Sequence, residues 1–388
     1  MARRNITLHG LGLLVVLGVS LVGAGLAAAA DRSILHGLSS ISAIASTVPG
    51  IGDVNPYGVF QVPTTTGNLE AGDILVSNFN NSANLQGTGT TIMQVAPDGS
   101  VSVFAQIDAT KLPGSCPGGV GLTTALVVLQ SGWVIVGSLP TTDGMPDTIG
   151  AGCLIVLNSS GSPVETFSGN MINGPWDMTV NDSGQTADLF VTNVLNGTVA
   201  AGGNVVNEGT VLRIHLTVSQ NTMPQVQSTT VVGSGFPEHT DPAALVIGPT
   251  GVGLSPACPD GGSNCASPVP ADARVLYVAD SADSRIAVIP HALTRTTTGN
   301  IGTTLAQGGG LNDPLGLTVA PNGNVLTVNG NNGFITEFTP EGRRIAIRLL
   351  NNTGAPPPGN GTLFGLIFDR DLGVVFVDDG SNTLNLLH

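Results

Sequence analysis

The sequence predicts an all-β protein, a six-bladed β-propeller made of four-stranded antiparallel blades, with its ring closed by an N-terminal strand. A unit of short strands and tight turns recurs six times along the chain. No long segment repeats its apolar residues every 3.6 positions, so extended helices are not expected. Six sheets arranged radially leave only short, protected edges, and a propeller is therefore the natural arrangement of such repeats.

Residues 311–350 show the unit most clearly. Four runs of apolar and β-branched residues are separated by turn residues at Asn322 and Gly323, at 329–333, and at Glu341 and Gly342. Strands joined by Asn-Gly and similar short turns form antiparallel hairpins. The segment is therefore predicted to be one complete four-stranded blade.

The other copies align with the second strand of this unit and the turn that follows it. Two columns of the alignment are polar in every copy. The first column holds Asn78, Ser138, Asn193, Asp280, Asn329 and Asp379, and the second holds Asn81, Thr141, Asn196, Asp283, Asn332 and Asn382.

Residues 1–30 are predicted to be a signal peptide, followed by a single propeller domain at 31–388. Arg3 and Arg4 precede an apolar run at 11–26, and the small residues Ala27 to Ala30 suit a cleavage site. The Arg pair leaves the export route, Sec or Tat, open. No later stretch is long and apolar enough to cross a membrane, so a secreted or periplasmic protein is expected.

The blades follow in order. The first is expected at about 55–107 and the second at about 119–167; the third opens at Asn173 and carries a Gly- and Asn-rich insertion at 197–209. The fourth opens near Pro249, with a long loop at 258–271. The sixth has only three strands before the chain ends at His388, so a strand at 41–48 is expected to complete it.

The four cysteines indicate an oxidising compartment, because their number is even and they follow a signal peptide. Cys258 and Cys265 share one loop, and Cys116 and Cys153 lie at ends of strands that meet on one face of a meander. The expected disulfides are Cys116–Cys153 and Cys258–Cys265, although the sequence alone allows three pairings.

Composition excludes two classes of partner. Charged residues make up 10% of the chain, the formal net charge is −14, and Lys111 is the only lysine. An acidic surface does not suit nucleic acid or an anionic membrane. A protein or small-molecule ligand is expected instead, bound by a monomer.

The turns at 96–99 and 320–323, together with 276–280 and the following 284–286, resemble NHL-repeat propellers and the related SMP-30 (gluconolactonase)-like propellers. The resemblance covers nearly the whole chain after residue 30. It implies a channel site in which a Glu-Gly-Pro glutamate and further Asn and Asp side chains bind a metal. Asn173 stands at the glutamate position, whereas Asp280 lies in a segment similar to the one that holds the catalytic aspartate.

The central channel is the first place to look for chemistry. The residues two positions after each blade's opening residue are small in five blades, and the sixth is an acid: Gly58, Ala125, Asp177, Gly251, Gly316 and Gly365. Asp177 is therefore a candidate metal ligand or general base. The alternative is that its carboxylate caps a turn or binds a neighbouring backbone amide.

The polar column is the second candidate. The oxygen-bearing side chains of Asn78, Asn193, Asp280, Asn329 and Asp379, joined by Asp177, would suit Ca²⁺ if they met at the axis. Asn and Asp also recur at strand ends because they tolerate left-handed backbone, so a role in turns is the alternative. His239 lies in a polar segment at 237–241 that is read either as an exposed loop or as a holder of a metal or proton.

Two functions follow from these observations. The first is a binding scaffold without catalysis, since no Gly-x-Ser-x-Gly, P-loop or His-Glu-x-x-His motif is present. The alternative is a Ca²⁺-dependent lactonase or esterase-like hydrolase with Asp177 or Asp280 as the catalytic acid. The sequence identifies neither the ligand nor the face of the propeller that binds it, and it leaves open whether the protein is an enzyme.

Overall fold

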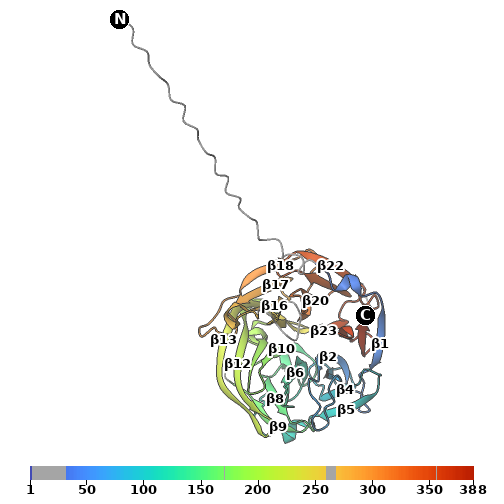
Figure 1. Cartoon of the computed structure of the whole chain (residues 1–388). Coiled ribbons are helices and arrows are strands. Elements are labelled where there is room, and N and C mark those ends of the chain that lie inside the picture. Colours follow the sequence, from blue (N-terminus) through green and yellow to red (C-terminus); the bar gives the residue numbers. More distant parts are fainter. Residues whose placement is uncertain (2–31, 170, 259–267, 355) are drawn as a thin grey trace.

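The computed structural model describes residues 1, 32–169, 171–258, 268–354 and 356–388. Six antiparallel sheets surround a central axis, which gives the round outline in Figure 1. In each blade the first strand lies nearest the axis and the fourth lies at the rim. The predicted six-bladed propeller is therefore confirmed.

The strands follow the predicted order from blade to blade. Blade 1 contains β2 (Val54–Gln61), β3 (Ile74–Asn80), β4 (Thr91–Val95) and β5 (Val101–Gln106). Blade 2 contains β6 (Leu122–Val128), β7 (Val134–Ser138), β8 (Cys153–Leu157) and β9 (Pro163–Phe167). Blade 3 contains β10 (Pro175–Asp182), β11 (Thr186–Asn193), β12 (Val206–Ser219), β13 (Thr222–Asp241) and β14 (Leu245–Ile247).

The second half of the ring has the same plan. Blade 4 contains β15 (Pro249–Leu254), β16 (Val275–Asp280), β17 (Arg285–Pro290) and β18 (Thr303–Gln307). Blade 5 contains β19 (Pro314–Val319), β20 (Val325–Asn329), β21 (Phe334–Phe338) and β22 (Arg344–Leu349). Blade 6 contains β23 (Leu363–Asp369), β24 (Gly373–Asp378), β25 (Thr383–Leu387) and β1 (Ile41–Ser46).

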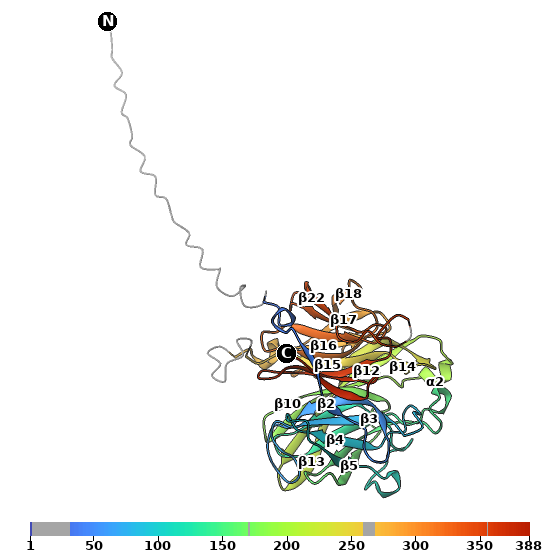
Figure 2. The same ribbon diagram turned by 90° about the vertical axis from the view of Figure 1, so that its right-hand side faces the viewer.

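Helices are short among the described residues. They are the 3₁₀ turns η1 (Leu35–Gly37), η2 (Ala109–Lys111), η3 (Pro146–Thr148) and η4 (Ala271–Ala273), and the α-helix α2 (Thr198–Ala201). The insertion expected at 197–209 forms α2 and the start of β12. Blade 3 also differs from the four-stranded plan, because β13 runs on and pairs with the extra strand β14. Figure 2 places α2 and β14 on the same face of the ring.

The turns explain why these runs fold as hairpins. Gly99, Gly323 and Gly342 have φ values of 86°, 88° and 87°, a left-handed conformation that only glycine adopts without strain. Each follows a polar residue between two apolar runs. The local sequence therefore fixes the register of the hairpins before any blade packs on another.

The apolar core lies between neighbouring blades rather than in one central cluster. Phe190 and Phe236 of blade 3, for example, pack with Leu276 and Val278 of blade 4, and all four are fully buried. Similar clusters join the other blades. Each sheet therefore buries both faces, and the ring is held by side chains that alternate between two neighbours.

Ring closure follows the prediction. β1 pairs antiparallel with β25, from Ile41 opposite Leu387 to Ser46 opposite Thr383. The segment before β1 is also anchored, because the fully buried Glu337 accepts hydrogen bonds from Ser33 Oγ and from the amides of Ile34 and Leu35, at 2.6, 2.8 and 3.0 Å. The first and last described strands therefore share one blade.

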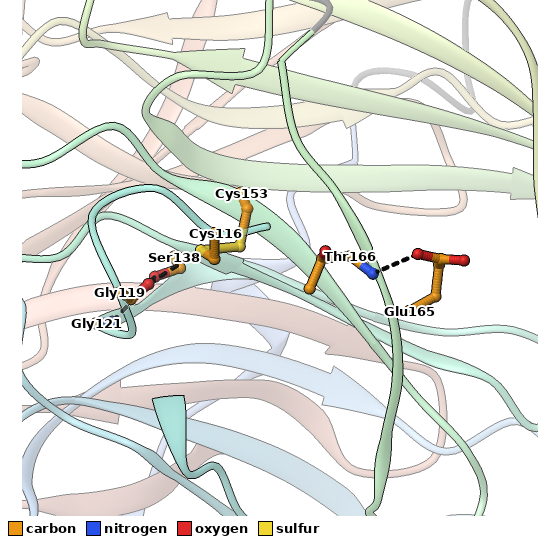
Figure 3. Close-up of a disulfide and its surroundings, with 7 residues drawn as sticks. All are labelled: Cys116, Gly119, Gly121, Ser138, Cys153, Glu165 and Thr166. Atoms are coloured by element: carbon orange, nitrogen blue, oxygen red, sulfur yellow. Dashed lines mark hydrogen bonds between the residues drawn. A yellow bond between two sulfur atoms is a disulfide. The ribbon is translucent and has the colours of Figure 1, made fainter. Parts of the chain in front are cut away.

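The disulfide Cys116–Cys153 is present, with the two Cα atoms 5.2 Å apart (Figure 3). Nearby, the Ser138 hydroxyl donates to the carbonyl of Gly119 and accepts from the amide of Gly121, each at 3.0 Å. The bond therefore fixes the loop that leads into β6 against β8. Cys265 lies outside the described residues, so the pairing Cys258–Cys265 stays a prediction.

The predicted signal peptide, 1–30, also lies outside the described residues, apart from Met1. Within the described ranges, no helix is long and apolar enough to cross a membrane.

Candidate functional site

A cavity of about 160 Å³ is lined by residues of all six first strands, and we call it the waist. The glycines there let neighbouring strands approach closely. A Cβ at Gly316 would lie 2.0 Å from the carbonyl oxygen of Phe364, and one at Gly365 would lie 2.3 Å from that of Tyr57. At Gly251, Gly316 and Gly365 the column is therefore small because the backbone of the neighbouring first strand leaves no room for a Cβ.

Asp177 stands where the other blades have glycine or alanine, and its carboxylate accepts hydrogen bonds from two backbone amides. Its Oδ1 accepts from its neighbour's amide, Met178 N, at 2.8 Å, and its Oδ2 accepts from Val252 N of blade 4 at 3.1 Å. Burial raises the pKa of Asp177 to about 7, although both amides oppose that shift. The carboxylate thus joins two blades. This agrees with the alternative in which Asp177 binds a neighbouring backbone amide, and its catalytic or metal-binding role stays a prediction.

Asp280, the other catalytic candidate, is paired within blade 4. Its Oδ2 lies 3.0 Å from Arg285 Nε and 2.7 Å from Arg285 Nη2, and both side chains are at least 96% buried. Burial raises the pKa of Asp280 to about 6, and Arg285 opposes that shift. Its Oδ1 has no hydrogen-bond partner among the described residues, and the catalytic and metal-binding roles of Asp280 stay predictions.

The asparagines of the polar column serve their own loops. The Asn193 Oδ1 accepts from the amides of Asn173 and Gly174 at 3.3 and 3.4 Å, and the Asn329 Oδ1 accepts from Asn312 N at 3.2 Å. The Asn78 Nδ2 donates to the carbonyl of Thr47 at 3.0 Å. Two of the six metal candidates line cavities, and these cavities differ: Asp177 lines the waist and Asp379 lines a larger one.

This larger cavity, of about 430 Å³, lies at the face of the ring where the first strands begin. We call it the mouth cup. Its floor includes Tyr57, Trp176 and Phe364, and its rim includes Asp241, Asp313 and Asp379. Segments of blades 1, 3, 5 and 6 contribute to it, and the extra strand β14 adds Val246 and Ile247.

The floor is a self-packed aromatic cluster. The Tyr57 ring stacks on Phe79 and Phe364, with centroids 4.4 and 4.0 Å away, and Trp176 meets its edge at 5.4 Å. These side chains are at least 92% buried. Stacked and edge-to-face pairs of this kind stabilise one another beyond their burial, by about 0.5–1.5 kcal/mol per pair. These mutual contacts restrict the movement of the rings that line the cup.

The rim carries carboxyl groups that are partly withdrawn from water. Burial raises the pKa of Asp379 to about 7, and the nearby Asp378 adds to the shift. Burial also raises the pKa of Asp313 to about 6; the charge of Asp241 adds to that shift and His239 reduces it. Among the described residues, no group donates a hydrogen bond to the Asp379 carboxylate.

Three more oxygens at the cup have no hydrogen-bond partner among the described residues. They are the Oδ1 atoms of Asn55, Asn80 and Asp313, whose side chains are at least 92% buried. Leaving such an acceptor without a donor costs about 1–3 kcal/mol. The cup is therefore suited to a ligand that supplies donors or positive charge.

Most of this site was not predicted from the sequence, although the residues next to the small-residue column carried a signal. The waist residues were found by counting two positions from each blade's opening residue. The residues one position earlier in four of the blades line the cup: Tyr57, Trp176, Leu315 and Phe364. Asn55 and Asp313, which directly precede the opening prolines, line it as well. Large side chains in an otherwise small-residue region mark the cup.

The segment at 237–241 is not an exposed loop, which was one of its two interpretations. It forms the end of β13, and Asp241 lines the cup. At the position of the resembled family's glutamate, the Asn173 Nδ2 donates to Asn196 Oδ1 at 2.6 Å. Within the described ranges, no three His, Cys, Asp or Glu side chains are grouped so that they could hold a metal ion.

Comparisons with known proteins support the fold. No protein-family model matches the chain, and no curated protein sequence does. Among solved structures, a gluconolactonase from Xanthomonas campestris is similar, with 13% identity, 89% of this chain and 88% of that one covered, and a TM-score of 0.50. A luciferin-regenerating enzyme is similar at 12% identity, with 88% of each chain covered and a TM-score of 0.51.

The expected resemblance to gluconolactonase-like propellers is thus confirmed as a similarity of structure. At these identities the likeness shows a common six-bladed architecture.

Proposed function

We propose that the protein is a ligand-binding propeller and that the mouth cup is its binding site. The observation that carries this proposal is the set of buried, unpartnered oxygens of Asn55, Asn80 and Asp313 at one cavity. Unpartnered buried atoms also occur elsewhere among the described residues, but these three oxygens belong to residues that line one cavity, where a bound ligand could bring donors to them. The aromatic floor gives that ligand a surface to rest on.

A blocking variant tests this site. Ala243 lies at the cup and is exposed, so Ala243→Trp would fill the cavity without entering the core. Compounds from a small-molecule library that raise the melting temperature of the native protein should fail to do so with this variant, since only binding to the folded form stabilises it. Ala200→Trp, on the exposed surface of α2, is the matched control. Equal stabilisation of both variants would move the binding site elsewhere.

A hydrolase is the alternative function, and one observation favours it. Asp313 and Asp379 share the cup and have pKa values raised to about 6 and 7, which suits an acid and a base near neutral pH. Lactone and ester hydrolysis that disappears in Asp379→Asn, while the melting temperature holds, would support catalysis. Hydrolysis that is unchanged in that variant would exclude this residue from the reaction.

Ca²⁺ is the cofactor proposed for that alternative. Asn55, Asn80 and Asp313 offer the amide and carboxylate oxygens that this ion prefers, and they would hold it. When bound, Ca²⁺ would polarise the carbonyl of a lactone or ester. Metal analysis of the purified protein, with melting curves recorded with and without a chelator, tests this assignment: stoichiometric Ca²⁺ and a chelator-sensitive melt would support it.

We further propose export to the periplasm or the medium as a single domain beginning near Asp31. The disulfide Cys116–Cys153 supports an oxidising compartment. N-terminal sequencing of the exported protein would check the cleavage site.

A further inference from the structure

The charges at the mouth cup have one sign. Asp241, Asp313 and Asp379 line it, and none of the described residues in its lining is basic. The whole chain has a formal net charge of −14, so the surrounding field has the same sign. A negatively charged ligand would meet repulsion there, and a positively charged one would be attracted and concentrated.

The unpartnered oxygens require donors rather than acceptors. The Oδ1 atoms of Asn55 and Asn80 are amide oxygens, and the Asn80 Nδ2 is already used, because it donates to Asn84 Oδ1 at 2.7 Å. The Asp313 Oδ1 is the third such oxygen. A group with several N–H bonds could satisfy more than one of them, as an ammonium does with its three donors.

The floor and one wall are apolar. Trp176, Phe364, Leu315 and Val246 line the cup, and its volume of about 430 Å³ is far larger than a single ion needs. Aromatic rings also attract cations through the negative charge of their faces. A bare metal ion would leave this apolar surface unused, and a neutral polyol would leave the carboxylates without a counter-charge.

We propose that the mouth cup binds an organic ammonium ion, with the charged nitrogen among the carboxyl groups that line the cup and an apolar or aromatic body on Trp176 and Phe364. This inference rests on the proposed function, in which the cup is the ligand site. It goes beyond it by naming the chemical class of the ligand, and the experiment separates the two.

Trp176 supplies the signal for the experiment. The chain has two tryptophans, and Trp133 lies outside the cup, where its Nε1 donates to the carbonyl of Ser219. Trp133→Phe therefore leaves Trp176 as the sole tryptophan. This protein is titrated with 2-phenylethylammonium chloride, with the neutral isostere 2-phenylethanol and with CaCl₂, while tryptophan fluorescence is recorded at constant ionic strength.

The ammonium should bind saturably and about tenfold or more tightly than the alcohol, since a charge-assisted hydrogen bond is about twice as strong as a neutral one. Equal affinities would overturn the ammonium assignment while leaving the cup as a ligand site. A saturable response to CaCl₂ alone would replace the ammonium by a metal ion. No response to any of the three probes would contradict both proposals.

Variants sharpen the result. Asp313→Asn and Asp379→Asn keep the shape of the side chains, and each should weaken ammonium binding about tenfold while alcohol binding stays within about twofold. Glu341→Gln, an exposed acid outside the cup, is the control and should change neither. Equal weakening of both probes would indicate a loss of shape rather than of charge, and would count against the proposal; melting curves would show whether each variant is folded.

Ammonium binding should also tighten between pH 5 and pH 8, since Asp313 and Asp379 ionise over this range whereas an alkylammonium stays charged, as lysine does. The groups that face these carboxyls are Tyr57, His239, Asp241 and Asp378. Affinity that falls as pH rises would contradict the assignment.

Discussion

The waist and the mouth cup share the first strands of blades 1, 3, 5 and 6, yet they differ in kind. At the waist, small residues let first strands touch, and Asp177 binds two backbone amides. At the mouth, one residue earlier along the strands, large side chains and unpaired oxygens surround an open cavity. The waist closes the ring, whereas the cup keeps an open cavity, which is the proposed ligand site.

Asp177 at the waist and Asp379 at the cup show the difference between the two cavities. Burial raises the pKa of both Asp177 and Asp379 to about 7. Asp177 receives two hydrogen bonds from backbone amides, whereas among the described residues nothing donates to the Asp379 carboxylate. A raised pKa therefore does not separate a structural acid from a functional one, but the partners of its oxygens do.

The largest expected effect tests the waist. Gly316→Val would force a branched side chain into a space where even a Cβ lies 2.0 Å from a backbone oxygen of blade 6. We expect a loss of more than about 4 kcal/mol in the free energy of unfolding, or no folded protein, because two first strands must separate. Denaturant unfolding measures it. Gly37→Ala, where nothing lies within 4 Å, should change stability by less than about 0.5 kcal/mol.

Asp177→Asn should have an intermediate effect that depends on pH. Because the folded-state pKa is raised, the contribution of Asp177 to stability is fully present below its ordinary value of 3.8 and is lost as the pH rises through about 7. At pH 4 the native side chain is a neutral carboxylic acid, which like an amide has one good acceptor oxygen, so the variant should differ in stability by less than about 1 kcal/mol. At pH 8 the native protein must bury an ionised carboxylate, and the variant should be the more stable of the two by about 1 kcal/mol or more.

Unfolding curves of Asp177→Asn and the native protein at several pH values check this. Asp371→Asn, a substitution of an exposed acid outside the ring of first strands, is the matched control. A constant deficit for Asp177→Asn between pH 4 and 8 would mean that the carboxyl is ionised throughout.

The smallest expected effect on stability is at the mouth. Asp379→Asn removes a carboxylate that no described group stabilises, so at pH 8 the free energy of unfolding should rise, by less than about 1 kcal/mol. Binding at the cup should weaken in the same variant. Residues held for a ligand commonly cost stability, and a marked destabilisation by Asp379→Asn would place this residue with the waist instead.

The sequence was sufficient for everything that repeats. Turn glycines such as Gly323 and Gly342, the column of small residues, the strand at 41–48 and the pairing Cys116–Cys153 all follow from patterns that recur or from strand topology. Each reflects local backbone chemistry or a contact between neighbours in the ring. Such features are predictable because they depend on residue type and spacing alone.

The cup was not predictable because it depends on where the repeats diverge. Asn55, Asp313 and Asp379 come from blades 1, 5 and 6, and Asp241 comes from the extension of blade 3, so no spacing along the chain links them. The repeated polar column was a candidate metal site, yet the side chains of Asn193 and Asn329 accept hydrogen bonds from backbone amides of the loops that lead into their own blades. Positions that are unusual within a repeat were more informative than positions that are shared.

Ring closure by β1 and β25 has a consequence for truncated chains. β25 comprises Thr383–Leu387 and lies between β24 and β1. Removal of this strand would leave β1 with no neighbour to pair with and blade 6 with only β23 and β24. A chain shortened in this way would keep open sheet edges that other chains can join.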